Sequence, residues 1–158
     1  MQTDELLLIA RETIDKVPLC FAITVDSSVA HARVVEASKL AEDWSVRFMT
    51  SRRCRKIREM DRSGRLTLAY QYDPEGAYVT LEGRPTLIDD VDVKRSLWKD
   101  NSYRWFPGGP EDSNVVVVEL STERIELWSS GRDVMPEPKG LSAVVLERDN
   151  AGWRYTTT

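Results

Sequence analysis

Cysteine and histidine are scarce in this sequence of 158 residues, and their scarcity excludes several classes of site. The two cysteines, Cys20 and Cys54, are too far apart for a CxxC motif or a zinc site, and they imply no disulfide framework. The single histidine, His31, cannot supply a two-histidine metal cluster, and no nucleophile motif accompanies it. Metal-dependent enzymes and triad hydrolases are therefore weak hypotheses.

Long apolar runs and a basic leader are also missing. No apolar run approaches the ~20 residues that a helix needs to cross a membrane. Asp4 and Glu5 precede the first apolar residues, which is unlike a signal peptide. The sequence pI near 5.2 argues against bulk nucleic-acid binding. We therefore expect a cytoplasmic protein whose partners include neither membrane nor nucleic acid.

The composition is that of an ordinary globular protein, with 41% hydrophobic and 30% charged residues. A chain of this length most simply forms one domain, which buries roughly two-thirds of the surface of the unfolded chain. We expect residues 1–130 to form the body of this domain and residues 131–158 to form a C-terminal extension of it.

The most unusual stretch is residues 48–57, which we interpret as the end of a strand, a basic turn and the start of a helix. Residues 52–65 contain seven Lys or Arg and two acids, a net charge of +5 within a chain of net charge −4. A helix N-terminus has unpaired N–H groups and a positive dipole end, and the Thr50 and Ser51 hydroxyls add donors there. The segment is either a phosphate-binding site or a solvated cluster of charges, and spacing alone leaves both open.

Two other features also have a structural and a functional interpretation. Arg33 and His31 alternate in a predicted strand and share a face, so Arg33 either faces solvent or binds an anion in a cleft. The segment Trp105-Phe106-Pro107-Gly108-Gly109-Pro110 cannot continue a helix and is expected to form a rigid loop. Its two aromatic residues either wall a flat ligand or plug the space under the loop.

Alternating apolar residues and turn signals predict a mainly β protein. We expect helices over 3–17, 54–61 and 90–105, and strands over 19–26, 29–35, 44–50, 66–72, 77–89, 115–128 and 141–146. A break or bulge is expected at 121–124, another at Gly83, and Pro85 should confine its half of the strand to a sheet edge. Regular strand spacing without βαβ alternation favours six or seven mostly antiparallel strands in a small barrel with short flanking helices.

The order of several motifs resembles that of the FMN-binding split-barrel proteins related to pyridoxamine 5′-phosphate oxidase. These motifs are Ala32-Arg33-Val34-Val35, Phe48-Met49-Thr50-Ser51 and Cys54-Arg55-Lys56-Ile57. Three later stretches, 78–84, 105–110 and 124–128, resemble the general stress protein branch of that superfamily. The resemblance covers roughly residues 3 to 130, and it depends on the order of the motifs rather than on any one of them. It implies an antiparallel split β-barrel of six or seven strands and a homodimer with two FMN sites at its interface.

The resemblance also implies which residues bind the cofactor. The FMN phosphate would be held by Arg33, Arg55 and Lys56. The ring and ribityl chain would be lined by Met49, Thr50 and the backbone of Val34 and Val35. Gln71 would come from the other subunit, Trp128 would stack near the cofactor, and Trp105 would border the ring. Three cations around a dianion form charge-assisted contacts, which favours the phosphate-binding interpretation of the basic turn.

The sequence departs from the family pattern in three places. Cys54 stands where many relatives have a Ser or Thr hydroxyl, and a thiol is a poorer donor to phosphate. Residues 125–132 resemble the C-terminal oxidase signature, but the Arg and His residues that hold the pyridoxal substrate of true oxidases are missing. Oxidation of pyridoxamine phosphate is therefore not expected. The tail beyond Arg132 resembles no part of the family.

Three functional hypotheses follow. The first is a flavin-dependent redox protein, reductase-like or oxidase-like, or a general stress protein with an unknown substrate. The flavin would supply the chemistry, and no catalytic residue is identifiable. The second is a non-enzymatic flavin carrier or sensor. The third is a polyanion-binding module that uses residues 52–65, which the acidic remainder of the chain disfavours.

Overall fold

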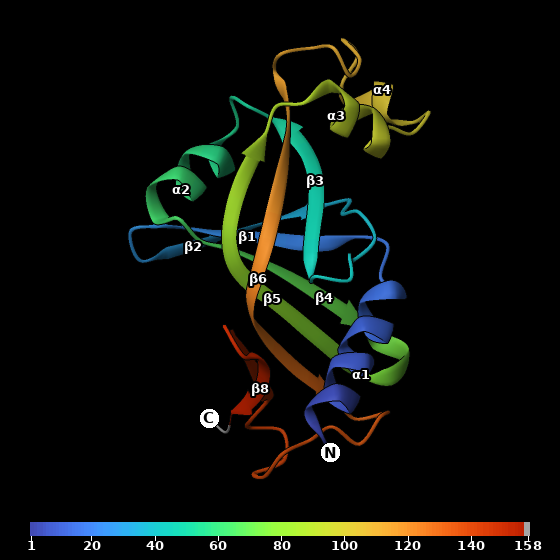
Figure 1. Ribbon diagram of the computed structural model, residues 1–158, viewed down its shortest axis with the longest axis vertical. Helices are drawn as coiled ribbons and strands as arrows, with labels where there is room; N and C mark the ends of the chain where they lie inside the picture. Colours follow the sequence, from blue (N-terminus) through green and yellow to red (C-terminus); the bar gives the residue numbers. More distant parts are fainter. Residues whose placement is uncertain (157–158) are drawn as a thin grey trace.

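The computed structural model describes residues 1–156, which form one sheet of eight strands with helices at its ends (Figure 1). The sheet order is β2-β1-β4-β5-β6-β7-β8, with β3 paired to β6, and every pairing is antiparallel. The mainly β, antiparallel architecture predicted from the sequence is confirmed.

The boundaries follow the predicted ones closely in the first half of the chain. The strands are β1 Cys20–Asp26, β2 Val29–Val35, β3 Ser45–Ser51, β4 Leu66–Tyr72, β5 Ala77–Ile88, β6 Val115–Ser129, β7 Val144–Asp149 and β8 Gly152–Thr156. The helices are α1 Thr3–Asp15, α2 Arg55–Ser63, α3 Val91–Leu97 and α4 Ser102–Trp105, with a 3-10 turn η1 at Asp73–Glu75.

The long strand β6 lies at the centre of the sheet. β5 pairs along one edge of β6, while the other edge is divided between β3 in its first part and β7 in its second. The apolar run Val115–Val118 is almost completely buried, as expected for a central strand. This divided edge separates the sheet into two halves that share β5 and β6.

A bulge lies in the β5–β6 ladder. Glu82 is opposite Arg124 and Gly83 is opposite Thr122, so Glu123 is the extra residue of β6. A Cβ atom at Gly83 would lie 1.9 Å from the carbonyl oxygen of Ser121, so only glycine allows this approach. β4 begins with Leu66 opposite Gly83, and residues 84–88 pair only with β6. The predicted bulge at Gly83 and the edge position of Pro85 are both confirmed.

The single helix predicted over 90–105 is wrong, because the segment forms the two short helices α3 and α4. The Asp90 carboxylate caps α3 by accepting hydrogen bonds from the backbone N–H groups of Asp92 and Val93, at 2.8 and 3.2 Å. Trp98 then leaves the helix with extended backbone, and its ring packs 5.1 Å from the ring of Tyr103. Tertiary packing of Trp98 therefore overrides helical periodicity here.

The tail contributes more of the sheet than expected. β7 begins at Val144, later than predicted, and the unexpected β8 pairs with it, so residues 1–156 contain eight strands rather than six or seven. Trp153 of β8 packs edge-on against Trp44, with ring centroids 5.7 Å apart. The tail is thus part of the same sheet and is anchored to the loop that precedes β3.

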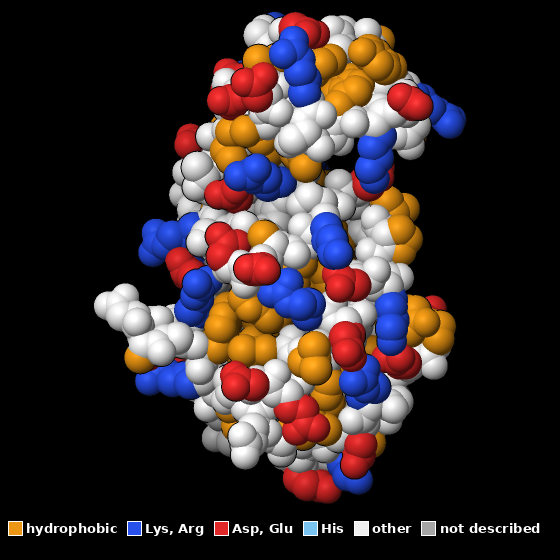
Figure 2. Space-filling model, turned by 45° about the vertical axis from the view of Figure 1, so that its right-hand side comes forward, with side chains coloured by type: hydrophobic (Ala, Val, Ile, Leu, Met, Phe, Trp, Pro, Cys, Tyr) orange, Lys and Arg blue, Asp and Glu red, His pale blue; other side chains and the backbone are white. Residues whose placement is uncertain are grey.

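The helices cover the ends of the sheet. α1 packs against β4, β5 and β8, and α2 packs against β1 at the other side of the molecule (Figure 1). On the face that Figure 2 shows, acidic and basic side chains are interspersed, and several separate hydrophobic patches lie between them along the length of the molecule. Within residues 1–156, no helix is both long and apolar enough to span a lipid bilayer.

Replacing Gly83 by alanine is expected to lower the free energy of unfolding by about 3 kcal/mol, the upper end for overpacking a dense site. The reason is the collision of the added methyl group with the Ser121 carbonyl. Urea unfolding of Gly83→Ala measures the change. Gly64→Asn is the control, because Gly64 has a positive φ of 65° that Asn tolerates and open space around it. Equal stability of Gly83→Ala and the native protein would contradict this account of the bulge.

Candidate functional site

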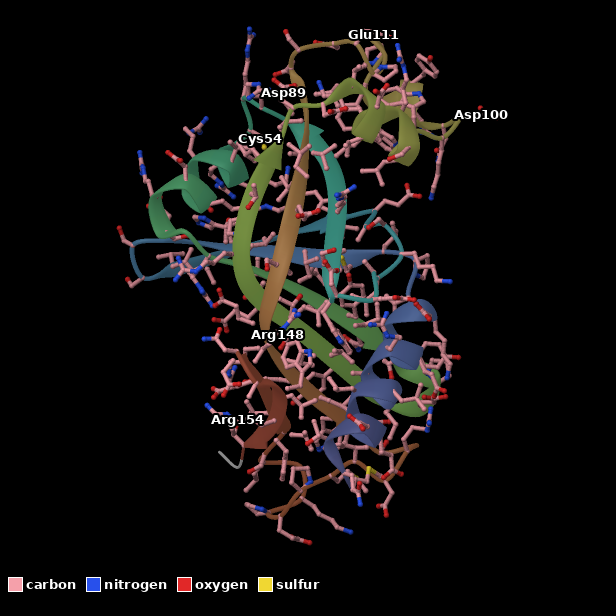
Figure 3. The ribbon with its side chains drawn as sticks, viewed as in Figure 1. Cys54, Asp89, Asp100, Glu111, Arg148 and Arg154 are labelled. Carbon is pink, nitrogen blue, oxygen red and sulfur yellow. The ribbon has the colours of Figure 1, made fainter. Side chains whose placement is uncertain are left out.

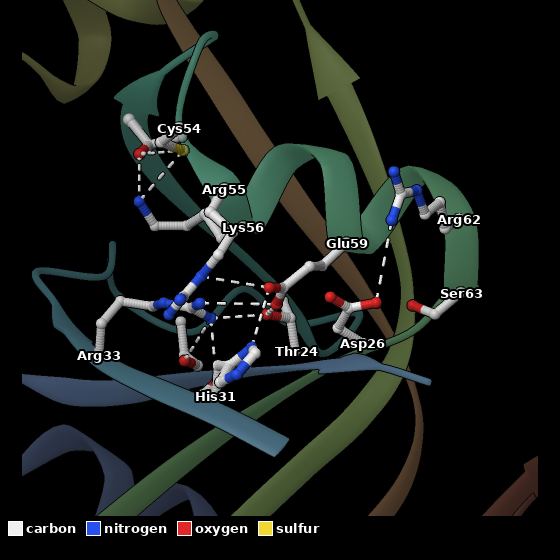
Figure 4. Close-up of polar contacts among 12 residues, drawn as sticks. Thr24, Asp26, His31, Arg33, Cys54, Arg55, Lys56, Glu59, Arg62 and Ser63 are labelled. Carbon is white, nitrogen blue, oxygen red and sulfur yellow. Dashed lines mark hydrogen bonds and ion pairs between the residues drawn. The ribbon is translucent and has the colours of Figure 1, made fainter. Parts of the chain in front are cut away.

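The connection from β3 to α2 places the basic turn at a helix N-terminus. Cys54 is the N-cap residue of α2, with extended backbone at φ −75° and ψ 157°, and it lies where β3 meets α2 (Figure 3). Ile57 and Met60 are buried and hold the helix against the sheet. Their burial turns Arg55, in the first turn of the helix, toward the neighbouring strands β1 and β2 (Figure 4).

Arg33 of β2 and Arg55 of α2 meet at a carboxylate that sequence reasoning missed. Arg55 Nε lies 3.2 Å from Glu59 Oε1, and Arg33 Nη2 lies 3.7 Å from Glu59 Oε2 (Figure 4). The structure therefore brings together two of the three cations that the sequence assigns to one anion. A helical spacing of four between Arg55 and Glu59 is the signal that could have revealed the pair.

Arg33 is fixed in position by its own strand and the neighbouring one. Its Nη1 donates hydrogen bonds to Thr24 Oγ1 at 2.7 Å, to the His31 carbonyl at 3.0 Å and to the Ala22 carbonyl at 3.3 Å. Its side chain is 21% exposed, which excludes the solvent-facing alternative. Its other guanidinium nitrogens are held beside α2 by this arrangement.

Glu59 is buried, with 2% of its surface exposed. The Thr24 hydroxyl donates to Oε2, and His31 Nδ1 lies 2.9 Å from Oε1. The pKa of Glu59 lies below its usual value, chiefly because the Thr24 hydroxyl donates a hydrogen bond to the carboxylate, which outweighs the opposing effect of burial. The hydrogen bond with His31 and the positive charge of Arg55 lower it further. A charged carboxylate therefore sits behind the two arginines at neutral pH.

Lys56 points toward β3 instead. Its Nζ donates to Thr50 Oγ1 at 2.6 Å and lies 3.4 Å from Cys54 Sγ. Partial burial opposes ionisation of the Cys54 thiol, but the Thr50 hydroxyl, the Ile57 N–H and the charge of Lys56 together lower its pKa. We call the set of Arg33, Thr50, Cys54, Arg55 and Lys56 the basic cluster.

Other predicted site residues lie around the basic cluster or apart from it. Met49 precedes Thr50 in β3, Val35 is buried beside Arg33, and Val34 is 55% exposed on the opposite face of β2. Trp105 is 66% exposed in α4, where Arg104 lies over its ring, whereas Phe106 packs against Trp98. Phe106 thus fills the space under the loop, as one of the two interpretations expected, whereas the Trp105 ring takes no part in this packing.

Gln71 and Trp128 lie at a second place, near the ends of β4, β5 and β6. Tyr78, which the sequence analysis did not select, is opposite both of them and stacks on Trp128 with ring centroids 6.2 Å apart. These three residues line a hollow of about 820 Å³ that residues 140–143 border. The hollow is at the η1 end of β4, whereas the basic cluster surrounds the N-terminus of α2.

An apolar face of the sheet lies between these two places. Phe21 is opposite Val34 on one side and Ala69 on the other, so side chains on this face alternate with the buried ones. Phe21 is 47% exposed and Val25 is 41% exposed. We call this surface, made of Phe21, Ile23, Val25, Ala30, Ala32 and Val34, the outer apolar face.

Comparison with known proteins fits this arrangement. The model of the family described as "Pyridoxamine 5'-phosphate oxidase like" matches residues 8–147. The chain belongs to this family. A second similarity is to General stress protein 26 of Bacillus subtilis, with 31% identity over 85 residues that represent 52% of this chain and 60% of that protein. The chain thus matches rather less than two-thirds of the length of this curated relative.

Solved structures in the family share the split-barrel fold. A protein related to general stress protein 26 from Clostridium acetobutylicum aligns over 91% of this chain and 95% of its own, with a TM-score of 0.71 and 15% identity. A pyridoxamine 5′-phosphate oxidase-related, FMN binding protein from Nostoc punctiforme aligns over 96% and 94%, with a TM-score of 0.69 and 15% identity. The split barrel predicted from the sequence is confirmed.

The two cysteines are expected to differ sharply in reactivity. Cys54 is partly exposed and its pKa is lowered, whereas Cys20 is 2% exposed and burial raises its pKa to about 11. Near pH 7.5, iodoacetamide should therefore alkylate Cys54 first, as peptide mass spectrometry would show. Lys56→Met should slow the alkylation of Cys54, since it removes the nearby positive charge. Equal labelling of both thiols in the folded protein would contradict the environment described for Cys54.

Proposed function

We propose that this protein binds FMN, with the phosphate in the basic cluster, and serves as a cytoplasmic flavin-dependent redox protein. The observation that carries the proposal is the convergence of Arg33 and Arg55, from separate elements, on one point in a member of this family. FMN would supply hydride or electron transfer. The Nostoc relative is an FMN binding protein, which supports the same cofactor here.

The chemistry of the basic cluster suits a phosphate monoester. Arg33, Arg55 and Lys56 carry three positive charges, and Glu59 reduces the formal total to +2, which balances a dianion. Guanidinium groups bind phosphate oxygens in pairs, and Lys56 adds a point charge beside the Thr50 hydroxyl. The Cys54 thiol is a weak donor, so its contribution is expected to be small.

A homodimer would complete the site. The outer apolar face is the kind of exposed apolar surface that marks an interface, and Gln71, Tyr78 and Trp128 extend the same face. In one protomer these three residues line the hollow at the η1 end of β4, which contains no residue of the basic cluster. A second copy packed on this face would cover it and place its Gln71 and Trp128 near the flavin ring.

The same geometry keeps a non-enzymatic carrier or sensor as a second candidate. The two groups near the phosphate that can exchange protons are already engaged, His31 with Glu59 and Cys54 with Thr50 and Lys56. Tight FMN binding without turnover, tested with a nicotinamide donor and a range of acceptors, would favour the carrier.

A polyanion-binding role receives less support. Four of the seven basic residues in 52–65 have an acidic partner: Arg52 pairs with Asp89, Arg55 with Glu59, Arg62 with Asp26, and Arg65 with Glu82 and Glu123. Their charges are therefore partly neutralised within the protein. Retention of nucleic acid in a gel-shift assay that is lost on Arg53→Ala would revive this role.

Arg33→Ala and Lys56→Ala are each expected to weaken FMN binding by about 1.5–3 kcal/mol, the range for hydrogen bonds to charged groups. Fluorescence titration with FMN gives the dissociation constants. The control is Arg53→Ala, an exposed arginine of the same turn, which should bind FMN as the native protein does. If both variants retain native affinity, the phosphate does not lie in the basic cluster even should flavin bind.

Phe21→Asp is expected to convert the proposed dimer to monomers, because a carboxylate on the outer apolar face would be buried among apolar side chains. Size-exclusion chromatography with light scattering measures the mass. The same variant should lose FMN affinity, although Phe21 lies on the sheet face opposite Arg33. Leu8→Asp, at an exposed position of α1, serves as the control for added charge. A dimeric Phe21→Asp protein would place the interface elsewhere.

A further inference from the structure

The basic cluster contains an anion of its own. The oxygens of the Glu59 carboxylate are contacted by Thr24, His31, Arg33 and Arg55, which come from β1, β2 and α2 (Figure 4). The residue is 2% exposed, so water does little to screen it. A site that only attracts a phosphate needs no buried acid, and this one therefore calls for a physical explanation.

The contacts of Glu59 fall into two groups. Thr24 and His31 tie it to the sheet and help to hold α2 in place. Arg33 and Arg55 are charged partners, and among residues 1–156 Glu59 is the only acid within 4 Å of either guanidinium. These are the same groups that a phosphate would contact. A carboxylate and a phosphate present the same kind of oxygen to a guanidinium, so they compete for it.

The competition falls unequally on the three cations. Arg55, whose side chain is 58% exposed, has its Nε committed to Glu59. Lys56, by contrast, contacts the neutral hydroxyl of Thr50 and the thiol of Cys54. The pKa of Glu59 is lowered, first by the hydrogen bond from Thr24, so the carboxylate stays charged in the range where FMN would be bound. Its negative charge also repels the phosphate directly.

We propose that Glu59 is an internal competitor of the phosphate, which weakens the hold of the basic cluster on FMN and allows the cofactor to exchange. This inference rests on the proposed function. A protein built for permanent retention of FMN gains nothing from such an acid. One that takes up and releases FMN gains a preformed but partly neutralised site, since Arg33 and Arg55 stay ordered when the phosphate leaves.

Glu59→Gln tests the inference, because it keeps the shape of the side chain and removes its charge. FMN should bind roughly two- to fivefold more tightly, which is what a partly exposed ion pair is worth. Riboflavin, which lacks the phosphate, should bind the variant and the native protein equally. Stopped-flow fluorescence should assign the gain to slower FMN dissociation. Unchanged or weaker FMN binding by a folded Glu59→Gln protein would overturn the inference.

Thr24→Val is the matched control for a purely structural role. It removes the hydroxyl that contacts Glu59 and Arg33, and the carboxylate keeps its contacts with His31, Arg33 and Arg55, whose positive charges favour its ionised form. It should lower the melting temperature without tightening FMN binding. If Glu59→Gln and Thr24→Val both weaken FMN binding in proportion to their loss of stability, Glu59 is only a structural residue and the inference fails.

Arg55→Met provides a test that does not depend on the folding of Glu59→Gln, since Arg55 is exposed. Because Arg55 is partly engaged by Glu59, its loss should weaken FMN binding less than the loss of Lys56 in Lys56→Met. A larger loss for Arg55→Met would overturn the inference.

Thermal unfolding with inorganic phosphate separates the failure of this inference from the failure of the proposed function. If phosphate raises the melting temperature, and does so more for Glu59→Gln than for the native protein, while FMN does not bind, then the flavin function fails and Glu59 remains a competitor of phosphate. If neither FMN nor phosphate binds, both fail.

Discussion

The pairing of β5 with β6 is the interaction on which the rest of this structure depends. It runs from Ala77 opposite Ser129 to Ile88 opposite Val117, and every other strand is joined to this pair either directly or through the strands between. The bulge at Gly83 changes the register in the middle of the ladder, at the point where β4 leaves the edge of β5. One half of the ladder therefore holds β3, which leads into α2, and the other half holds β4 and β7.

This division explains why the candidate site residues fall into two groups. The basic cluster depends on β3 and α2, whereas Gln71 and Trp128 lie toward the η1 end of β4 and its neighbours. No local rearrangement of one sheet joins these places, because the ladder between them is buried and hydrogen-bonded along its length. The homodimer proposed above would bring the two groups together in one composite site without bending the fold, with the outer apolar face as its interface.

The sequence predicted most of the fold because most of it is decided by local pattern. β2 and β4 have the predicted bounds, since their apolar alternation matches the pleat. The predictions fail where tertiary contacts determine the local structure. Trp98 ends α3 and packs against Tyr103, and β8 forms by pairing with the free edge of β7. In the site, cations could be selected by type and spacing. Glu59 could not, because a surface helix usually exposes its glutamates, and only the packing of α2 on the sheet buries this one.

The burial of Glu59 also constrains how the basic cluster can be organised at all. Two guanidinium groups held beside each other without a counter-ion would repel, and Arg55, the more exposed of the two, would move into solvent. A buried acid removes that repulsion, and its hydrogen bonds from Thr24 and His31 keep it ionised despite burial. The negative charge that holds Arg33 and Arg55 together must also reduce the attraction of these two guanidinium groups for an incoming anion. The Glu59 carboxylate therefore orders the arginines of the empty site and, by the same charge, weakens their binding of a phosphate.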